Sequence, residues 1–157
     1  MKKRESVYFL GIGGIGMSAL ARYFKAKGFD VAGYDRTSTL LTKELEAEGI
    51  SIHYNDDVAL IPELYKDPQN TMVVYTPAVP ADMSELVWFR EHKFNVCKRS
   101  QALGEVTRMQ QAICVSGTHG KTTTSTMIAH LLHNSSVKCN AFLGGISKNF
   151  DRNLLLS

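Results

Sequence analysis

The chain has few of the residues from which disulfide scaffolds and metal centres are built. It contains 3 cysteines in 157 residues, Cys97, Cys114 and Cys139. Because their number is odd and no two of them form a CxxC pair, neither a disulfide framework nor a zinc site is predicted. The thiols are expected to stay reduced, as in a cytoplasmic protein. Four histidines lack the spacing to other ligands that is typical of a metal site, namely His53, His92, His130 and His133.

Long apolar runs and a strong charge bias are also absent. No stretch of roughly 18 or more apolar residues occurs, so no membrane-spanning helix is expected. The formal net charge of +3, from 18 basic and 15 acidic residues, gives no reason to expect a nucleic-acid partner.

Residues 2–21 resemble a secretory signal, with a basic start and an apolar run. Four glycines within residues 11–16 make that run a poor apolar helix, so we expect a cytoplasmic protein.

The rest of the sequence alternates between strand patterns and helix patterns. Apolar segments bounded by turn residues predict strands over residues 6–11, 29–34, 50–53, 71–76 and 94–97. An apolar stripe in residues 17–24 predicts a helix that Gly28 ends. This order of elements indicates an α/β fold with a Rossmann-like, mostly parallel sheet and helices on both faces.

Two further helices are predicted from their capping signals. One begins with Thr37 or Ser38 as its cap and runs through Glu48. The other begins at Asp82, because Glu85 three positions later resembles a capping box, and extends to about residue 92. A short helix over residues 101–109 then leads out of the sheet.

The alternation begins again after Arg108. Residues 112–116 predict a new buried strand, and residues 141–143 predict a strand that Gly144 and Gly145 end. Between them, one helical stripe contains Thr124, Met127, Ile128, Leu131 and Leu132. We therefore predict one domain over residues 1–108 and a partial P-loop β-α-β unit, the truncated start of a second domain, over residues 109–157.

This second unit is not expected to be stable alone, because a single β-α-β unit cannot bury both of its faces. Either the chain is a fragment, or residues 109–157 pack against the first domain or against another molecule. The last alternative would produce a homodimer through this region.

A glycine-rich loop follows the first predicted strand and opens the first predicted helix. Its residues are Gly11, Ile12, Gly13, Gly14, Ile15 and Gly16. Gly11 permits the tight turn, Gly13 lets the backbone approach a diphosphate, and Gly16 lets the helix pack closely on the strand. Free N–H groups and the positive helix end favour a phosphate. The pattern predicts a nucleotide-diphosphate site; the alternative is a tight turn without a ligand.

Asp35 ends the next predicted strand, 19 residues after Gly16. An acidic residue at this place contacts the ribose in dinucleotide sites. The alternative is a helix cap or a solvated residue at a strand end. The glycine loop and Asp35 also fit an NAD-binding oxidoreductase or an NAD-sensing module, which leaves the GTHGKTTT segment, residues 117–124, unexplained.

A second phosphate-binding pattern consists of Gly117, Thr118, His119, Gly120, Lys121, Thr122 and Thr123. Lys121 can neutralise the β- and γ-phosphates of ATP, and the Thr122 hydroxyl can ligate Mg²⁺. The general pattern GxxxxGK[ST] has a glycine where this chain has Val115. We predict an ATP site with Lys121 and Thr122 as catalytic residues. A glycine-rich turn before a threonine-rich helix is the simpler alternative, and a small P-loop kinase would need more residues after Arg108.

The two phosphate patterns together narrow the possibilities. The series GIGGIGMSALA, GYD, TPAVP, GTHGKTTT and LGG, between about Val7 and Gly145, resembles the Mur ligases of peptidoglycan synthesis. The resemblance covers the UDP-sugar domain of that family and the opening of its central ATPase domain. The acid and histidine that help to hold Mg²⁺ later in the central domain have no counterpart here, and neither does the C-terminal domain associated with the amino acid.

The resemblance implies an ATP-dependent ligase that joins L-alanine to UDP-N-acetylmuramate through an acyl phosphate. It implies that residues 11–16 lie along the UDP diphosphate and that residues 117–123 hold ATP with Mg²⁺. The residues implied near the uridine are Asp35, Thr76, Pro77, Ala78 and Val79, the last four of which otherwise predict only a rigid loop. This chain alone is expected to be inactive. A relative that joins a whole peptide to the same nucleotide sugar stays open, because no amino-acid domain is visible.

Overall fold

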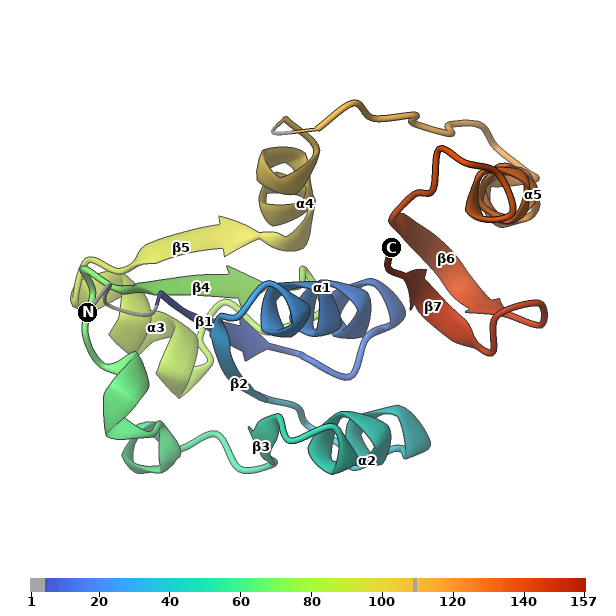
Figure 1. Ribbon diagram of the computed structural model, residues 1–157. Helices are drawn as coiled ribbons and strands as arrows, with labels where there is room; N and C mark the ends of the chain where they lie inside the picture. Colours follow the sequence, from blue (N-terminus) through green and yellow to red (C-terminus); the bar gives the residue numbers. More distant parts are fainter. Residues whose placement is uncertain (1–4, 109) are drawn as a thin grey trace.

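The computed structural model describes residues 5–108 and 110–157, and its main feature is a five-stranded sheet (Figure 1). Its strands are β1 (Ser6–Leu10), β2 (Asp30–Tyr34), β3 (Ser51–His53), β4 (Thr71–Tyr75) and β5 (Asn95–Lys98). They lie in the order β3-β2-β1-β4-β5, and every neighbouring pair is parallel. All of β1 is buried, as expected for the central strand of a covered parallel sheet. The predicted α/β fold class is confirmed.

Helices cover both faces of this sheet. On one face, α1 (Ile15–Ala26), α2 (Leu40–Ala47) and α4 (Arg99–Arg108) share a core with Val7 and Phe9. On the other face, α3 (Ser84–Glu91) and two 3₁₀ turns, η1 (Val58–Leu60) and η2 (Glu63–Tyr65), pack against Tyr8 and Leu10. Alternate residues of β1 therefore supply the two cores, as the pleat of a strand requires.

Two predicted helix caps are wrong. The cap of α2 is Thr39, not Thr37 or Ser38, because the Thr39 and Thr42 side chains each accept a hydrogen bond from the backbone N–H of the other. At α3 the predicted Asp82–Glu85 capping box does not form, and the helix begins at Ser84. Its first two N–H groups donate instead to the Asp56 carboxylate, at 2.8 and 3.1 Å. A cap supplied from another loop has no local sequence signal.

The C-terminal region differs from the predicted β-α-β unit. Residues 112–116 form no strand; they belong to a connection that leads to α5 (Lys121–His133), and the Ile113 side chain is 68% exposed. β6 (Ala141–Ser147) continues through both glycines that were predicted to end it, and it pairs antiparallel with β7 (Arg152–Leu155). A strand needs a neighbour for its backbone hydrogen bonds. β7 gives one to β6, whereas residues 112–116 pair with no strand in the described chain.

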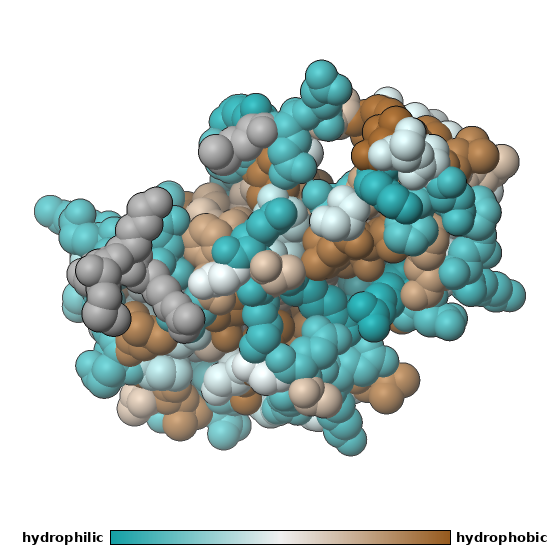
Figure 2. Space-filling view, in the orientation of Figure 1, coloured by the Kyte–Doolittle hydropathy of each residue, from teal (hydrophilic) through white to brown (hydrophobic). Residues whose placement is uncertain are grey.

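Apolar side chains remain exposed around α5. Met127 and Leu131, from the stripe predicted to be buried, are 62% and 70% exposed. Figure 2 shows apolar surface gathered at the end of the molecule where this helix lies. Association of this region with a second copy stays a prediction. Residues 1–4 and residue 109, where the signal-like pattern and the second domain were predicted to begin, lie outside the described residues. Among the described helices, none has the length and apolarity to cross a bilayer.

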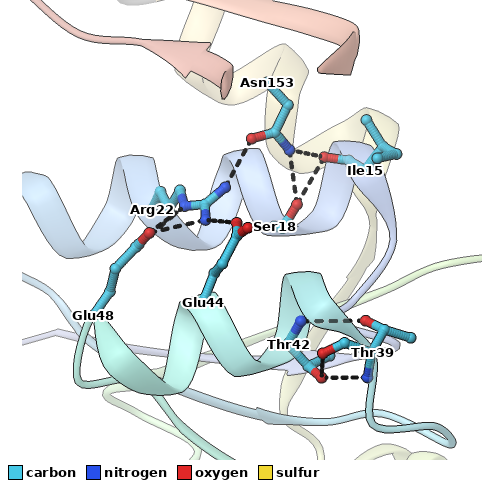
Figure 3. A network of polar contacts seen from close by, with 8 residues as sticks. All are labelled: Ile15, Ser18, Arg22, Thr39, Thr42, Glu44, Glu48 and Asn153. Atoms are coloured by element: carbon cyan, nitrogen blue, oxygen red, sulfur yellow. Dashed lines mark hydrogen bonds and ion pairs between the residues drawn. The ribbon is translucent and has the colours of Figure 1, made fainter. Parts of the chain in front are cut away.

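The β6–β7 hairpin is docked on α1 through one buried side chain. Asn153 is fully buried, and its amide donates to Ile15 O at 2.6 Å and to Ser18 Oγ at 2.8 Å. Its carbonyl oxygen accepts from Arg22 Nη1 at 2.9 Å. Figure 3 shows that Arg22 also reaches two carboxylates at α2, Glu44 and Glu48. One polar network therefore joins α1, α2 and the hairpin.

We expect Asn153→Ala to release the hairpin from α1. The substitution removes three hydrogen bonds, one of them from a charged guanidinium, so the free energy of unfolding should fall by about 2–4 kcal/mol. Urea unfolding measures this change, and amide hydrogen exchange in β7 should accelerate. Asn149→Ala, at an exposed position of the same hairpin, is the control and should change stability by less than about 0.5 kcal/mol. Equal exchange rates in both variants would contradict the docking role.

Candidate functional site

Five loops begin side by side at the carboxyl edge of the sheet. The last residues of the strands form one row in the register, namely His53, Tyr34, Leu10, Tyr75 and Lys98. The residues that follow them form a second row, in the spatial order Tyr54, Asp35, Gly11, Thr76 and Arg99. Ligands of open α/β sheets bind at this edge. In Figure 1 the strands point toward the side on which β6 and β7 lie.

The turn after β1 requires glycine for two reasons. Gly11 has a φ of 83°, which side chains rarely adopt. A Cβ atom at this position would also lie 2.6 Å from Thr76 Cγ2. The N–H groups of Gly11 and Ile12 both donate to Tyr34 O, at 2.8 and 3.0 Å. The turn is therefore fixed against the strands on either side of it.

Asp35 contacts the glycine loop directly. Its Oδ2 accepts a hydrogen bond from Gly13 N at 2.7 Å, and its Oδ1 accepts one from Thr37 N at 3.1 Å. A Cβ atom on Gly13 would lie 2.8 Å from Asp35 Oδ2, so the close approach needs a residue without a side chain. The structure brings together the two features that the sequence places 22 residues apart. Asp35 here holds the loop by its backbone.

A cavity of about 340 Å³ lies beside the start of α1. Its walls come from the glycine loop, the beginning of α4 and the middle of β6, with Gly14, Gly16, Thr76, Arg99, Phe142 and Gly144 among its residues. Val79 packs at Gly11, whereas Pro77 and Ala78 are exposed and do not line this cavity. A cavity of about 430 Å³ lies at the opposite, amino edge, beside Ser6 and Thr71. Because α/β sheets bind ligands at the carboxyl edge, the first cavity is the candidate site.

Arg99 is a site residue that the sequence patterns did not indicate. It is the first residue of α4, and it lines the cavity from the side opposite to β6. A Cβ atom on Gly16 would lie 2.9 Å from its Nη1, so the guanidinium rests on the glycine loop. Arg99 stands beside Thr76 in the second row because β5 pairs with β4. Knowledge of the strand order would therefore have identified it as a residue of the carboxyl edge.

The second phosphate pattern forms a loop at the start of α5. Gly117 and Gly120 have φ values of 149° and 77°. Lys121 Nζ donates to Gly117 O at 2.6 Å and to Thr118 O at 3.1 Å, so its ammonium folds over the loop. Residues 117–123 are all exposed, and His119 is among them. The loop geometry leaves the N-terminal N–H groups of a 13-residue helix open to an anion.

The middle of β6 lies between the glycine loop after β1 and the loop before α5. Gly144 lines the cavity beside Gly16, and a Cβ atom on Gly144 would lie 3.0 Å from Thr122 Oγ1. Gly145 is farther from the same threonine, since a Cβ atom added there would lie 3.7 Å from Thr122 Cγ2. A single strand without side chains at these positions therefore forms a wall between the loops.

A buried polar chain lies behind the sheet edge. Tyr8 Oη is 2.6 Å from His53 Nε2 and 3.1 Å from Glu85 Oε2, and the Glu85 side chain is fully buried. Burial raises the pKa of Glu85 to about 8, and nearby Asp56 adds to the rise. Burial also raises the pKa of Tyr8 and lowers the pKa of His53. All three groups are therefore most stable in their neutral forms.

The hydrogen-bond geometry agrees with neutral side chains at Tyr8, His53 and Glu85. His53 Nδ1 lies 2.9 Å from Asn55 O, which can only accept, so in neutral imidazole Nε2 must be the acceptor. The phenolic O–H of Tyr8 faces two acceptors, because Tyr8 Oη donates to Glu85 Oε2 at 3.1 Å and lies closer to His53 Nε2, at 2.6 Å. Glu85 Oε1 has no hydrogen-bond partner among the described residues, which an uncharged carboxyl tolerates better than a carboxylate.

Comparison with known proteins decides the family. A family model described as "Mur ligase family, catalytic domain" matches residues 6–111. The chain belongs to the Mur ligase family. This Mur ligase chain is 61% identical over 153 residues to the UDP-N-acetylmuramate–L-alanine ligase of Porphyromonas gingivalis, covering 98% of the chain and 34% of that protein. It is 54% identical over 152 residues to the ligase of the same name from Cytophaga hutchinsonii, covering 97% and 33%.

Solved structures agree with this assignment. The UDP-N-acetylmuramate–alanine ligase of Thermotoga maritima matches with a TM-score of 0.83 and 32% identity, over 95% of this chain and 34% of its own. A UDP-N-acetylmuramate:L-alanyl-γ-D-glutamyl-meso-diaminopimelate ligase from Neisseria meningitides matches with a TM-score of 0.86 and 28% identity, over 97% and 46%. The Mur ligase chain spans about a third of the length of its curated relatives. The alternative of an NAD-binding oxidoreductase finds no support among these relatives.

We expect the buried Glu85 to make this Mur ligase chain less stable as the pH rises. Its pKa is about 8 in the folded chain and near 4.5 when exposed, so the folded state binds more protons between these values. The stabilisation is complete below about pH 4.5 and is lost as the pH rises through about 8. His53 acts in the opposite direction, because its folded pKa is lowered.

The variant Glu85→Gln separates the effect of Glu85 on the pH dependence of stability from the opposite effect of His53. The free energy of unfolding of the parent chain minus that of the variant should decrease from pH 5 to pH 8, over the window set by the raised pKa. Urea unfolding at several pH values measures it. Glu91→Gln, at an exposed site on the same helix, should give a nearly flat difference. A flat difference for Glu85→Gln as well would show that Glu85 titrates normally.

Proposed function

We propose that this chain is the nucleotide-sugar-binding part, with the start of the ATP-binding domain, of an ATP-dependent ligase that joins L-alanine to UDP-N-acetylmuramate. The observation that supports the proposal is that the two loops predicted to bind phosphate lie on the two sides of β6, with Gly144 between them. A ligase that forms an acyl phosphate needs its acid and its ATP within reach of one another. The names of the relatives supply the identity of the substrates.

The first loop would hold the nucleotide sugar. Residues 11–16 would lie along the diphosphate, because Gly14 and Gly16 line the cavity at the start of α1. Asp35 would lie near the uridine while it holds the loop through Gly13 N. The loop of residues 76–79 would close the same side, since both Thr76 and Val79 pack against Gly11.

The second loop would hold ATP and Mg²⁺. Its fit rests on the positive φ values of Gly117 and Gly120 and on the exposed helix start. Thr122 would ligate Mg²⁺ together with the ATP phosphates, and the ion would neutralise charge on the transferring phosphoryl group. Lys121 bonds only backbone carbonyls of the loop, so its ammonium can turn to the β- and γ-phosphates.

In this arrangement the chain would act mainly by holding the nucleotide sugar and ATP in position for the reaction. The lactyl carboxylate attacks the γ-phosphorus of ATP and displaces ADP, and the amine of L-alanine then displaces phosphate from the acyl phosphate. Gly144 and Gly145 would let the two substrates approach from opposite sides of β6, because no side chain stands between them. Lys121 would stabilise the charge that develops during the phosphoryl transfer. These nucleotide substrates fit a cytoplasmic enzyme.

L-Alanine is favoured over a peptide as the second substrate. Structures of both kinds of ligase resemble the chain, with TM-scores of 0.83 and 0.86, so the fold does not choose between them. The curated relatives at 61% and 54% identity are both named as alanine ligases.

We expect UDP-N-acetylmuramate to stabilise the chain against heat. At about 100 times its dissociation constant it should add about 2.7 kcal/mol and raise Tm by roughly 5–12 °C. UDP should give a smaller rise and NADH none. Differential scanning fluorimetry measures all three. A rise with NADH alone would overturn the proposal.

We expect Lys121→Ala to weaken the binding of Mg-ATP without affecting the nucleotide sugar. Removal of one charge-assisted contact should lower ATP affinity about 10- to 100-fold. Isothermal titration calorimetry with each ligand separates the two effects. Lys138→Ala, beyond the far end of α5, removes the same charge and should leave both affinities unchanged. Equal losses for both ligands in Lys121→Ala would contradict separate sites.

A further inference from the structure

We propose that Arg99 binds the diphosphate of the nucleotide sugar together with the backbone of the glycine loop. The inference rests on the proposed function and adds a residue to its binding site. It assigns a charged side chain to a site whose other described lining residues are uncharged.

The first support is position. Arg99 follows the last residue of β5 and therefore stands at the carboxyl edge, in the row that also contains Gly11 and Thr76. It lines the cavity of about 340 Å³ at the start of α1. Its guanidinium lies against Gly16, with Nη1 2.9 Å and Cζ 3.3 Å from the place of a Cβ atom there. A ligand at the loop N–H groups would thus meet this cation.

The second support is the charge around Arg99. Within residues 5–108 and 110–157, no carboxylate forms an ion pair with Arg99. Among the described residues that line the cavity, Arg99 is the one with a charge. It is also the first residue of α4, where the helix dipole disfavours a positive charge. A half-buried guanidinium in this place is electrostatically unfavourable until an anion joins it.

The chemistry of the pair favours a diphosphate. Guanidinium presents a planar set of N–H donors that matches two oxygens of a phosphate group. The N–H groups at the start of α1 attract the same kind of anion. One diphosphate can therefore be shared between the loop backbone and Arg99, which would place the ligand between α1 and α4.

The test is isothermal titration calorimetry on the 157-residue chain with UDP-N-acetylmuramate, UDP-N-acetylglucosamine, UDP and uridine. Arg99→Gln should lose about 10- to 100-fold in affinity for all three diphosphates and nothing for uridine. Arg99→Lys should recover part of the loss, because it restores the charge but not the planar donors. Arg108→Gln, at the other end of α4, removes the same charge and should bind as the parent chain does.

The outcomes separate this inference from the proposed function. If the parent chain binds the diphosphates and Arg99→Gln binds them as tightly as Arg108→Gln does, the role of Arg99 is overturned. The proposed function would remain intact. A loss confined to UDP-N-acetylmuramate would assign Arg99 to the lactyl carboxylate and overturn the diphosphate assignment. A parallel loss for uridine would show general damage and also overturn it. If the parent chain bound none of the four ligands, the proposed function and this inference would both fall.

Unfolding of the ligand-free variants gives a second measurement. Arg99→Gln should be as stable as the parent chain or more stable, because it removes, from a helix N-terminus, a cation that has no acidic partner among the described residues. A marked loss of stability would mean that Arg99 acts within the fold, and would overturn its assignment to the ligand.

Discussion

The parallel register of the five strands is the constraint on which the site depends. Because the strands run the same way and end in one row, the loops that follow them must start at the same edge. Gly11, Asp35 and Thr76 are far apart in the sequence and adjacent in space for this reason alone. The turn at Gly11 then makes contacts to both neighbours, through Tyr34 O on one side and Thr76 on the other. A shift of one residue between β1 and β2 would separate the glycine loop from Asp35.

The second half of the structure is positioned by polar contacts more than by its own core. α5 leaves large apolar side chains exposed, while the hairpin adds Phe142 and Leu154 to the core around α1. Asn153 fixes the register of that contact, because each of its polar atoms has a partner on α1. This contact also places β6, and with it the loop before α5, beside the cavity at the glycine loop.

Local patterns predicted most of the sheet and the two glycine-containing turns at the starts of α1 and α5, since strands, glycine turns and helix starts are encoded within a few residues. The errors came from contacts over long sequence distances. Asp56 caps α3 from 28 residues away, which no local motif records. Residues 112–116 have the composition of a strand and lack a neighbour to pair with. Arg99 has no motif of its own, and it becomes a site residue only once β5 is placed beside β4.

The two glycines of β6 make the partition between the loops one backbone thick. A ligand on either side that moves this strand must alter the shape of the opposite site. Thermodynamic linkage then requires the effect to be mutual, with each ligand changing the dissociation constant of the other by the same factor. Any side chain at Gly144 would thicken the partition, because even its Cβ atom would lie 3.0 Å from Thr122 Oγ1.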